Sequence, residues 1–160
     1  MQFTQSVSYP GTVDEVVAMY LTPAYLERRF GQFVVEGSQA VSVEGERVSF
    51  AGTVRPELIP AAAARFVKSD LRISFTEEWT TNEAGATSRT SVTVDGAPVS
   101  VEASSTLAPA EAGSVRDVTG NVSVRVPLLG GRIEKEAVAH LGRVVEREQA
   151  LATQWLEEHR

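Results

Sequence analysis

The chain has 160 residues, of which 42% are hydrophobic and 22% are charged, as in an ordinary folded domain and unlike a disordered segment. Its net charge of −6, with no run of Lys or Arg, argues against nucleic-acid binding, and the absence of cysteine excludes disulfides and thiolate chemistry. No signal-peptide pattern precedes the first strand, and no stretch approaches the roughly 20 apolar residues that span a bilayer. We therefore expect a single cytoplasmic domain, residues 1–160, without nucleic-acid binding or stable membrane insertion.

The N-terminal part of the sequence predicts a strand followed by two short helices. Apolar and polar residues alternate over residues 3–9, which is typical of a half-buried strand. Thr12 and Glu15 have the spacing of a capping box at the start of the first helix. Thr22 and Pro23 suit the cap and the first position of the second helix.

The middle of the chain predicts six further strands. Their period-two patterns cover residues 41–43, 48–54, 71–79, 88–94, 99–107 and 118–126. Glu44-Gly45-Glu46 and Asp95-Gly96 are hairpin signals, so the sheet is expected to be mostly antiparallel. Val115 is out of phase with the last strand and suggests a bulge or a late strand start.

Two segments interrupt or end this strand pattern. Residues 55–70 lie between Pro-marked breaks (Pro56 and Pro60), with a possible helical turn at 61–67, and such a segment is often a lid or an entrance. From Arg132 to His159 apolar residues recur with helical period, which predicts an amphipathic helix of about 28 residues, or about 42 Å.

This order of elements resembles the START-like (birch-pollen-allergen-like, helix-grip) superfamily. The resemblance rests on Tyr9-Pro10, on the sequence Thr22-Pro23-Ala24-Tyr25, and on the strand-to-helix corner at residues 126–134. It is greatest to a small, mostly actinobacterial START-like family with no assigned function. It implies an α+β fold in which a curved seven-stranded antiparallel sheet grips a long C-terminal helix, with two short helices between strands 1 and 2. It also implies a hydrophobic cavity for a lipid, a polyketide or another apolar molecule.

The residues themselves also suggest a cavity. Many side chains on the expected inner face are small, among them Gly37, Gly52, Ala103, Ser105 and Gly120, and would leave space beneath a long helix. The alternative is a flatter sheet that lets the helix settle closer. We expect the ligand-binding residues to be Gln39, Phe50, Phe75, Glu77, Trp79, Val101, Val122, Leu141 and Val144.

Three polar residues invite a chemical interpretation. Glu77 is in phase with Phe75 and Trp79, so it is either an inward ligand anchor or base, or paired with an arginine, or turned to solvent by a bulge. Glu148 lies in the apolar arc of the long helix, where it is either a second inward carboxylate or a partner of an arginine on the second short helix. His140, one turn after Glu136, is a base or a rim residue.

Three functions follow from these patterns. The first is binding of an apolar or amphipathic small molecule between sheet and helix, anchored by Glu77 or Gln39. The second is a polyketide cyclase- or hydrolase-like enzyme in which Glu77, Glu148 or His140 acts as acid or base. The third, protein docking on the helix, is disfavoured by its charged outer face. We expect neither a metal nor a cofactor.

Overall fold

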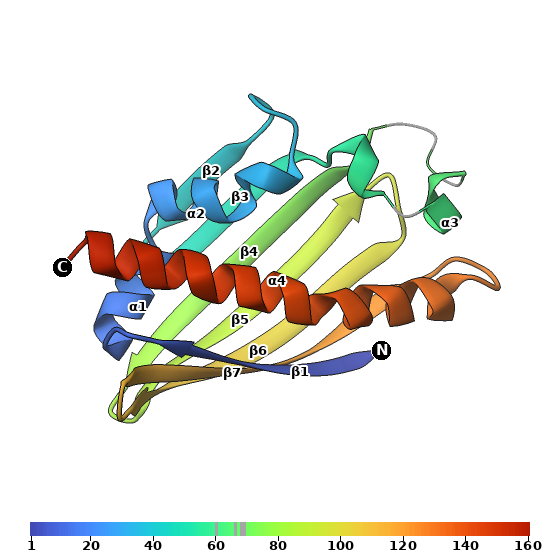
Figure 1. The fold of residues 1–160 in the computed structure, drawn as a ribbon. Coiled ribbons are helices and arrows are strands. Elements are labelled where there is room, and N and C mark those ends of the chain that lie inside the picture. The colour runs from blue at the N-terminus through green and yellow to red at the C-terminus, as the bar shows by residue number, and fades with distance from the viewer. Residues whose placement is uncertain (60, 66, 68–69) are drawn as a thin grey trace.

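The computed structural model describes residues 1–59, 61–65, 67 and 70–160 and shows a curved sheet with a long helix lying across its concave face (Figure 1). The strands are β1 (Gln2–Tyr9), β2 (Ala40–Glu44), β3 (Arg47–Thr53), β4 (Arg72–Asn82), β5 (Gly85–Asp95), β6 (Val99–Ala110) and β7 (Gly113–Val124). The helices are α1 (Val13–Tyr20), α2 (Pro23–Phe30), α3 (Ala61–Ala64) and α4 (Gly130–Glu158), with 3-10 turns η1 (Gly31–Phe33) and η2 (Pro56–Leu58).

The seven strands form one sheet in the order β1-β7-β6-β5-β4-β3-β2, and every neighbouring pair is antiparallel. Strands β1 and β2 are therefore the two edges, although they are consecutive in sequence. The short helices α1 and α2 carry the chain from one edge to the other (Figure 1). The predicted fold class is confirmed in its strand number, its strand direction and its helices.

The caps of the two short helices differ. At α1 the predicted capping box is present, because Thr12 Oγ1 accepts from the Glu15 N–H at 3.2 Å and Glu15 Oε1 accepts from the Thr12 N–H at 2.9 Å. At α2, Pro23 occupies the first turn as expected, but Thr22 makes no side-chain cap. Thr22 is the N-cap residue as predicted, but its hydroxyl donates to the Ala18 carbonyl at 2.7 Å instead of capping a helix N–H.

Strand β7 starts earlier than the sequence indicated. It is paired without interruption from Gly113, where Val115 lies opposite Ser8 on β1 and Ala108 on β6. The predicted bulge or late start is wrong, since Val115 is simply on the outer face of a regular strand. Ser114 and Arg116 consequently point toward α4 and are both buried.

Helix α4 has 29 residues and begins two residues before the predicted start at Arg132. The corner before it is tight: β7 ends at Val124, two residues short of the expected Val126, and Leu128 has a φ of 67°. Gly130 then packs directly on β7, because a Cβ there would lie 2.2 Å from the Val124 carbonyl oxygen.

The two ends of α4 are packed, whereas its middle is not. Ile133 near the start and Ala152, Trp155 and Leu156 near the end are buried. Between them Leu141 and Val145 are only half-buried, and Val144 is 42% exposed. The helix is thus anchored at its ends and stands off the sheet in the middle.

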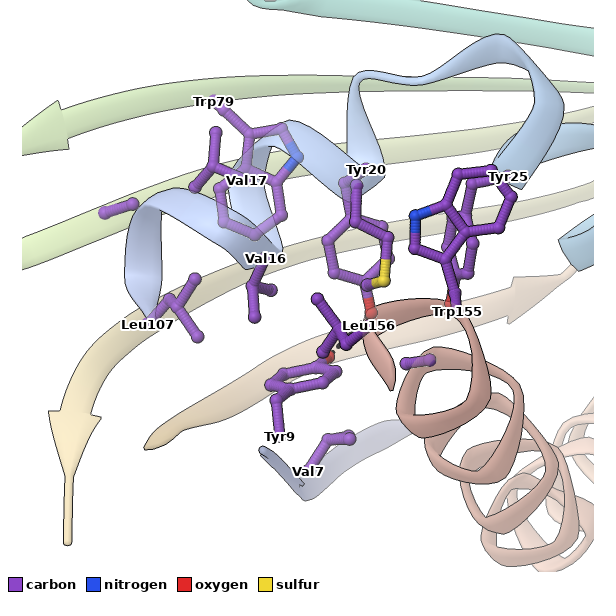
Figure 2. Packing of buried hydrophobic residues seen from close by; sticks show 13 residues of the cluster. Val7, Tyr9, Val16, Val17, Tyr20, Tyr25, Trp79, Leu107, Trp155 and Leu156 are labelled. Atoms are coloured by element: carbon purple, nitrogen blue, oxygen red, sulfur yellow. Dashed lines mark hydrogen bonds between the residues drawn. The ribbon is translucent and has the colours of Figure 1, made fainter. Parts of the chain in front are cut away.

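The largest core cluster lies where the C-terminal end of α4 meets α1, α2 and the sheet (Figure 2). Tyr20 is stacked on Trp79 with ring centroids 5.5 Å apart, and it meets the ring of Tyr25 edge-on. Trp155 of α4 packs edge-on against Tyr25. These aromatic contacts fix α4 to the short helices and to β4.

The segment predicted as a lid carries two short helical turns. Of the expected turn at 61–67, helix α3 covers Ala61–Ala64, while Phe66 lies outside the described residues, as do Pro60, Lys68 and Ser69. Within the described part of the chain, no helix has both the length and the apolarity to cross a membrane.

Candidate functional site: a pocket with a buried ionic cluster

A pocket of about 400 Å³ lies between the middle of α4 and the sheet. Its apolar wall includes Phe30, Phe50 and Phe75 on one side and Leu141 and Val144 of α4 on the other. Charged side chains line one end only, and these are Arg29, Glu77, Arg116 and Glu148. The pocket is therefore apolar along most of its length, apart from Gln5 on β1, and charged at a single end.

The small residues of the sheet are not the main source of this space. A Cβ on Gly120 would lie 2.5 Å from the Phe3 ring, and a Cβ on Gly52 would lie 2.7 Å from Val34 Cγ1, so neighbouring side chains already fill both positions. Gly37, with a φ of 85°, belongs to the chain before β2 and not to a strand. The space arises instead because α4 stands away from the sheet.

Glu77 points inward, as its strand phase predicted, and it is fully paired. Its Oε2 accepts hydrogen bonds from Arg116 Nη2 at 3.0 Å and from the Thr90 hydroxyl at 2.8 Å. Its Oε1 accepts from the Trp79 indole N–H at 3.0 Å and lies 3.8 Å from Arg29 Nη1. The expected alternative of an arginine partner is confirmed, and a bulge that turns Glu77 to solvent is ruled out.

Arg116 is the functional candidate that the sequence analysis missed. It is 4% exposed and donates to Ser105 Oγ at 2.9 Å and to Ser88 Oγ at 3.1 Å. Its guanidinium also lies 4.8 Å from the centroid of the Trp79 ring. The available signal was its position, since Arg116 is in phase with Val118 on the inner face of β7.

Glu148 is held by residues of the short helices. Its Oε1 forms an ion pair with Arg29 Nη2 at 2.9 Å and accepts a hydrogen bond from the Tyr20 hydroxyl at 2.8 Å, and the Tyr20 and Tyr9 hydroxyls are 2.6 Å apart. The expected pairing with an arginine of the second short helix is confirmed, with Arg29 as that arginine. Arg28 instead pairs with Glu158 at the surface.

The cluster is charge-balanced, with two arginines facing two glutamates. Burial alone would raise the pKa of the Glu77 carboxyl, but the charges of Arg116 and Arg29, with the hydrogen bonds from Thr90 and Arg116, hold that pKa below its usual value. Burial raises the pKa of Tyr20 well above its ordinary value, so this hydroxyl stays protonated as a donor. Arg29 Nη1 is buried and has no hydrogen-bond partner among the described residues.

The other predicted site residues fall in different places. Trp79 is buried behind the cluster, and its indole serves Glu77 instead of lining the pocket. Gln39 lies outside the pocket, where its side-chain oxygen accepts from the Gly37 N–H at 3.0 Å. Val101 lines the pocket, whereas Val122 lines a second, neighbouring pocket. His140 is exposed on α4 and lines an open hollow of about 520 Å³ together with Glu57 and Arg132, away from the ionic cluster.

The pairing of Glu77 makes stability depend on pH in a defined direction. The folded-state pKa of Glu77 is below the ordinary value of 4.5. The ion pair therefore contributes its full stabilisation above pH 4.5, and this stabilisation is lost as the pH falls through the folded-state pKa. We expect the free energy of unfolding in urea to fall below pH 4.5, and the gap between the wild type and Glu77→Gln to narrow there. Comparing the wild type with Glu77→Gln separates the contribution of Glu77 from those of Glu15, Glu134 and Glu158, because these three are present in both proteins. Their pKa values are also lowered by hydrogen bonds. A gap that stays constant down to pH 3 would contradict the expectation.

Comparison with solved structures first defines the class of fold. The chain is similar to the Thermus thermophilus protein TTHA0849 (TM-score 0.60, 15% identity, covering 99% of this chain and 97% of that one). It is also similar to norcoclaurine synthase from Thalictrum flavum in complex with dopamine and hydroxybenzaldehyde (TM-score 0.58, 13% identity, covering 100% and 87%). These likenesses, with the sheet and helix described above, show the START-like helix-grip fold.

Sequence comparison then gives the family. The family described as "Protein of unknown function (DUF2505)" matches residues 4–156, and the chain belongs to it. Among its relatives is the uncharacterized protein Rv0481c of Mycobacterium tuberculosis, which is 25% identical over 166 residues covering 96% of this chain and 95% of that one.

Proposed function

We propose that this protein binds an apolar or amphipathic small molecule in the pocket between α4 and the sheet. The observation that carries the proposal is the pocket itself, with about 400 Å³ of mostly apolar space and a charged cluster at one end. Ligand sites are commonly of this kind, with an apolar wall and a few fixed polar groups. The norcoclaurine synthase structure adds support, because a similar fold there holds two small aromatic compounds.

The polar end favours a ligand that carries a neutral acceptor. The two arginines are already balanced by Glu77 and Glu148, so a ligand carboxylate would add an uncompensated buried charge. Arg29 lines the pocket, and its Nη1, although 3.8 Å from Glu77 Oε1, has no hydrogen-bond partner among the described residues, so an alcohol, ester or ketone oxygen would complement it.

The way into this pocket is expected between α2 and α4. A smaller hollow of about 40 Å³ there shares Arg29, Phe30, Phe33, Val144 and Glu148 with the pocket lining. Val144, which lines both the pocket and this hollow, is 42% exposed, as expected for a residue at an entrance.

A cyclase- or hydrolase-like activity is the weaker proposal. It requires an inward carboxylate or His140 that is free to exchange protons. Glu77 is held by two arginines and two further donors, Glu148 by Arg29 and Tyr20, and His140 is outside the pocket.

The uncharged apolar dye Nile red tests the binding proposal by its fluorescence on titration. We expect Nile red to bind the wild type and Val101→Trp to weaken binding at least about tenfold, because the indole fills the pocket. Ser104→Trp is the matched control, since it adds the same side chain to the exposed outer face of β6. Equal dye affinity in the wild type and in a folded Val101→Trp variant would overturn the proposal.

A further inference from the structure

A second pocket, of about 220 Å³, lies beneath the first turns of α4. Its described lining residues are all apolar and come from the sheet, from α4 and from the segment after β3. From that segment it includes Val54, Leu58 and Ile59, and from α4 it includes Ile133 and Ala137. Neither the proposed binding function nor the ionic cluster accounts for this space.

The two pockets are neighbours along the same elements. On each of four elements, one residue lines the smaller pocket and a nearby residue lines the larger one. In that order, the pairs are Val99 and Val101 on β6, Val94 and Val92 on β5, Leu71 and Ile73 at β4, and Ala137 and Leu141 on α4. Each strand pair is one inward position apart, and the helix pair is one turn apart. The pockets therefore follow one another under α4, and on β7 the Phe3 ring lies over Gly120 between Val118 of the larger pocket and Val122 of the smaller one.

The two pockets differ in polarity, and the distance they span together sets the length of a ligand that would fill both. The charged groups of the larger pocket lie at its Glu148 end, whereas the described residues of the smaller pocket are apolar, and Ile133 and Ala137 also border the open hollow that contains Arg132 and His140. The helix between Glu148 and Ile133 measures about 22 Å at 1.5 Å per residue. An extended alkyl chain, with carbon–carbon bonds of about 1.5 Å, advances about 1.3 Å per carbon, so about sixteen carbons match this length.

We infer that the two pockets form one elongated site, which takes an unbranched long-chain amphipath with its oxygen at Arg29 and its tail toward Ile133. This inference rests on the proposed binding function and adds the ligand class to it. The larger pocket holds the head and the first part of the chain, roughly the 10 Å from Glu148 to Leu141 or about eight carbons. The smaller pocket holds the rest of the tail.

Primary alkanols of increasing length test the inference. Octanol, dodecanol and hexadecanol are delivered from methyl-β-cyclodextrin to the folded protein with Nile red bound. The affinity of each alkanol is measured from its displacement of the dye. Each methylene that enters an apolar site raises affinity up to about fourfold. We expect dodecanol to bind more tightly than octanol, and hexadecanol at least a hundredfold more tightly than octanol.

Two variants locate the tail. Val99→Phe adds a ring to the smaller pocket from the sheet, and Ala137→Phe adds one from the helix side, where Ala137 borders both this pocket and the open hollow beside His140. We expect either variant to bind octanol within about twofold of the wild type but to lose most of the gain from octanol to hexadecanol. Ala139→Phe places the same ring at an exposed helix position and should behave as the wild type.

The results separate this inference from the proposed function. If affinity levels off at octanol in the wild type, or if both pocket-filling variants keep the full chain-length gain, the elongated site is overturned while binding in the larger pocket stands. If neither Nile red nor any alkanol binds, the proposed function fails and the elongated site fails with it.

Discussion

Glu77→Gln is expected to lower the free energy of unfolding by about 3 kcal/mol, although the new side chain is nearly the same size. The amide oxygen can replace only one of the two carboxylate oxygens, so the variant loses the acceptor for Trp79 or for Thr90 as well as the charge opposite Arg116 and Arg29. Arg116 is 4% exposed and would remain buried without a counter-charge. Urea unfolding at pH 7 measures the effect.

Two further variants test this explanation. Glu78→Gln removes the same charge from the exposed outer face of β4 and should change stability by less than about 0.5 kcal/mol. The double variant Glu77→Leu with Arg116→Met replaces the pair by apolar side chains of similar size and should recover part of the stability lost in Glu77→Gln. If Glu77→Gln is as stable as the wild type, the ionic cluster is not a structural element.

Trp79→Ala is expected to be as damaging, with a loss of about 3–5 kcal/mol, because it leaves a large cavity in the core. Trp79 is 1% exposed, is stacked on Tyr20 and donates its indole N–H to Glu77. It thus packs the core and supports the carboxylate of the candidate site at the same time. Thermal and urea unfolding followed by circular dichroism measure the loss.

The two contributions of Trp79 can be separated. Trp79→Phe keeps a ring in the core but removes the donor to Glu77, and it should cost about 1–2 kcal/mol for the hydrogen bond, plus a smaller packing loss. Val35→Ala, at a position that is 42% exposed, serves as the surface control and should change stability by less than about 1 kcal/mol. A Trp79→Ala variant as stable as Val35→Ala would show that this core is not tightly packed.

Local patterns in the sequence predicted the order of strands and helices, whereas the curved sheet gripping the long helix was implied by the resemblance to the START-like superfamily. Period-two alternation, the hairpin signals and the helical period after Pro127 predicted the strands and the long helix, because hydrophobic periodicity and turn residues act over short distances. The same alternation placed Glu77 on the inner face, and the capping box at Thr12 was confirmed.

The composition of the site was decided by tertiary structure alone. Glu77 and Arg116 are 39 residues apart in sequence, and their pairing depends on how β4 to β7 lie side by side, which no local pattern states. The same holds for the separation of Val101 and Val122 into different pockets and for the placement of Gln39 outside both. The pocket itself depends on the height of α4 above the sheet, and packing at the two ends of the helix sets that height. A helical repeat shows which face of α4 is turned inward, but the distance to the sheet is fixed by contacts between residues far apart in the chain.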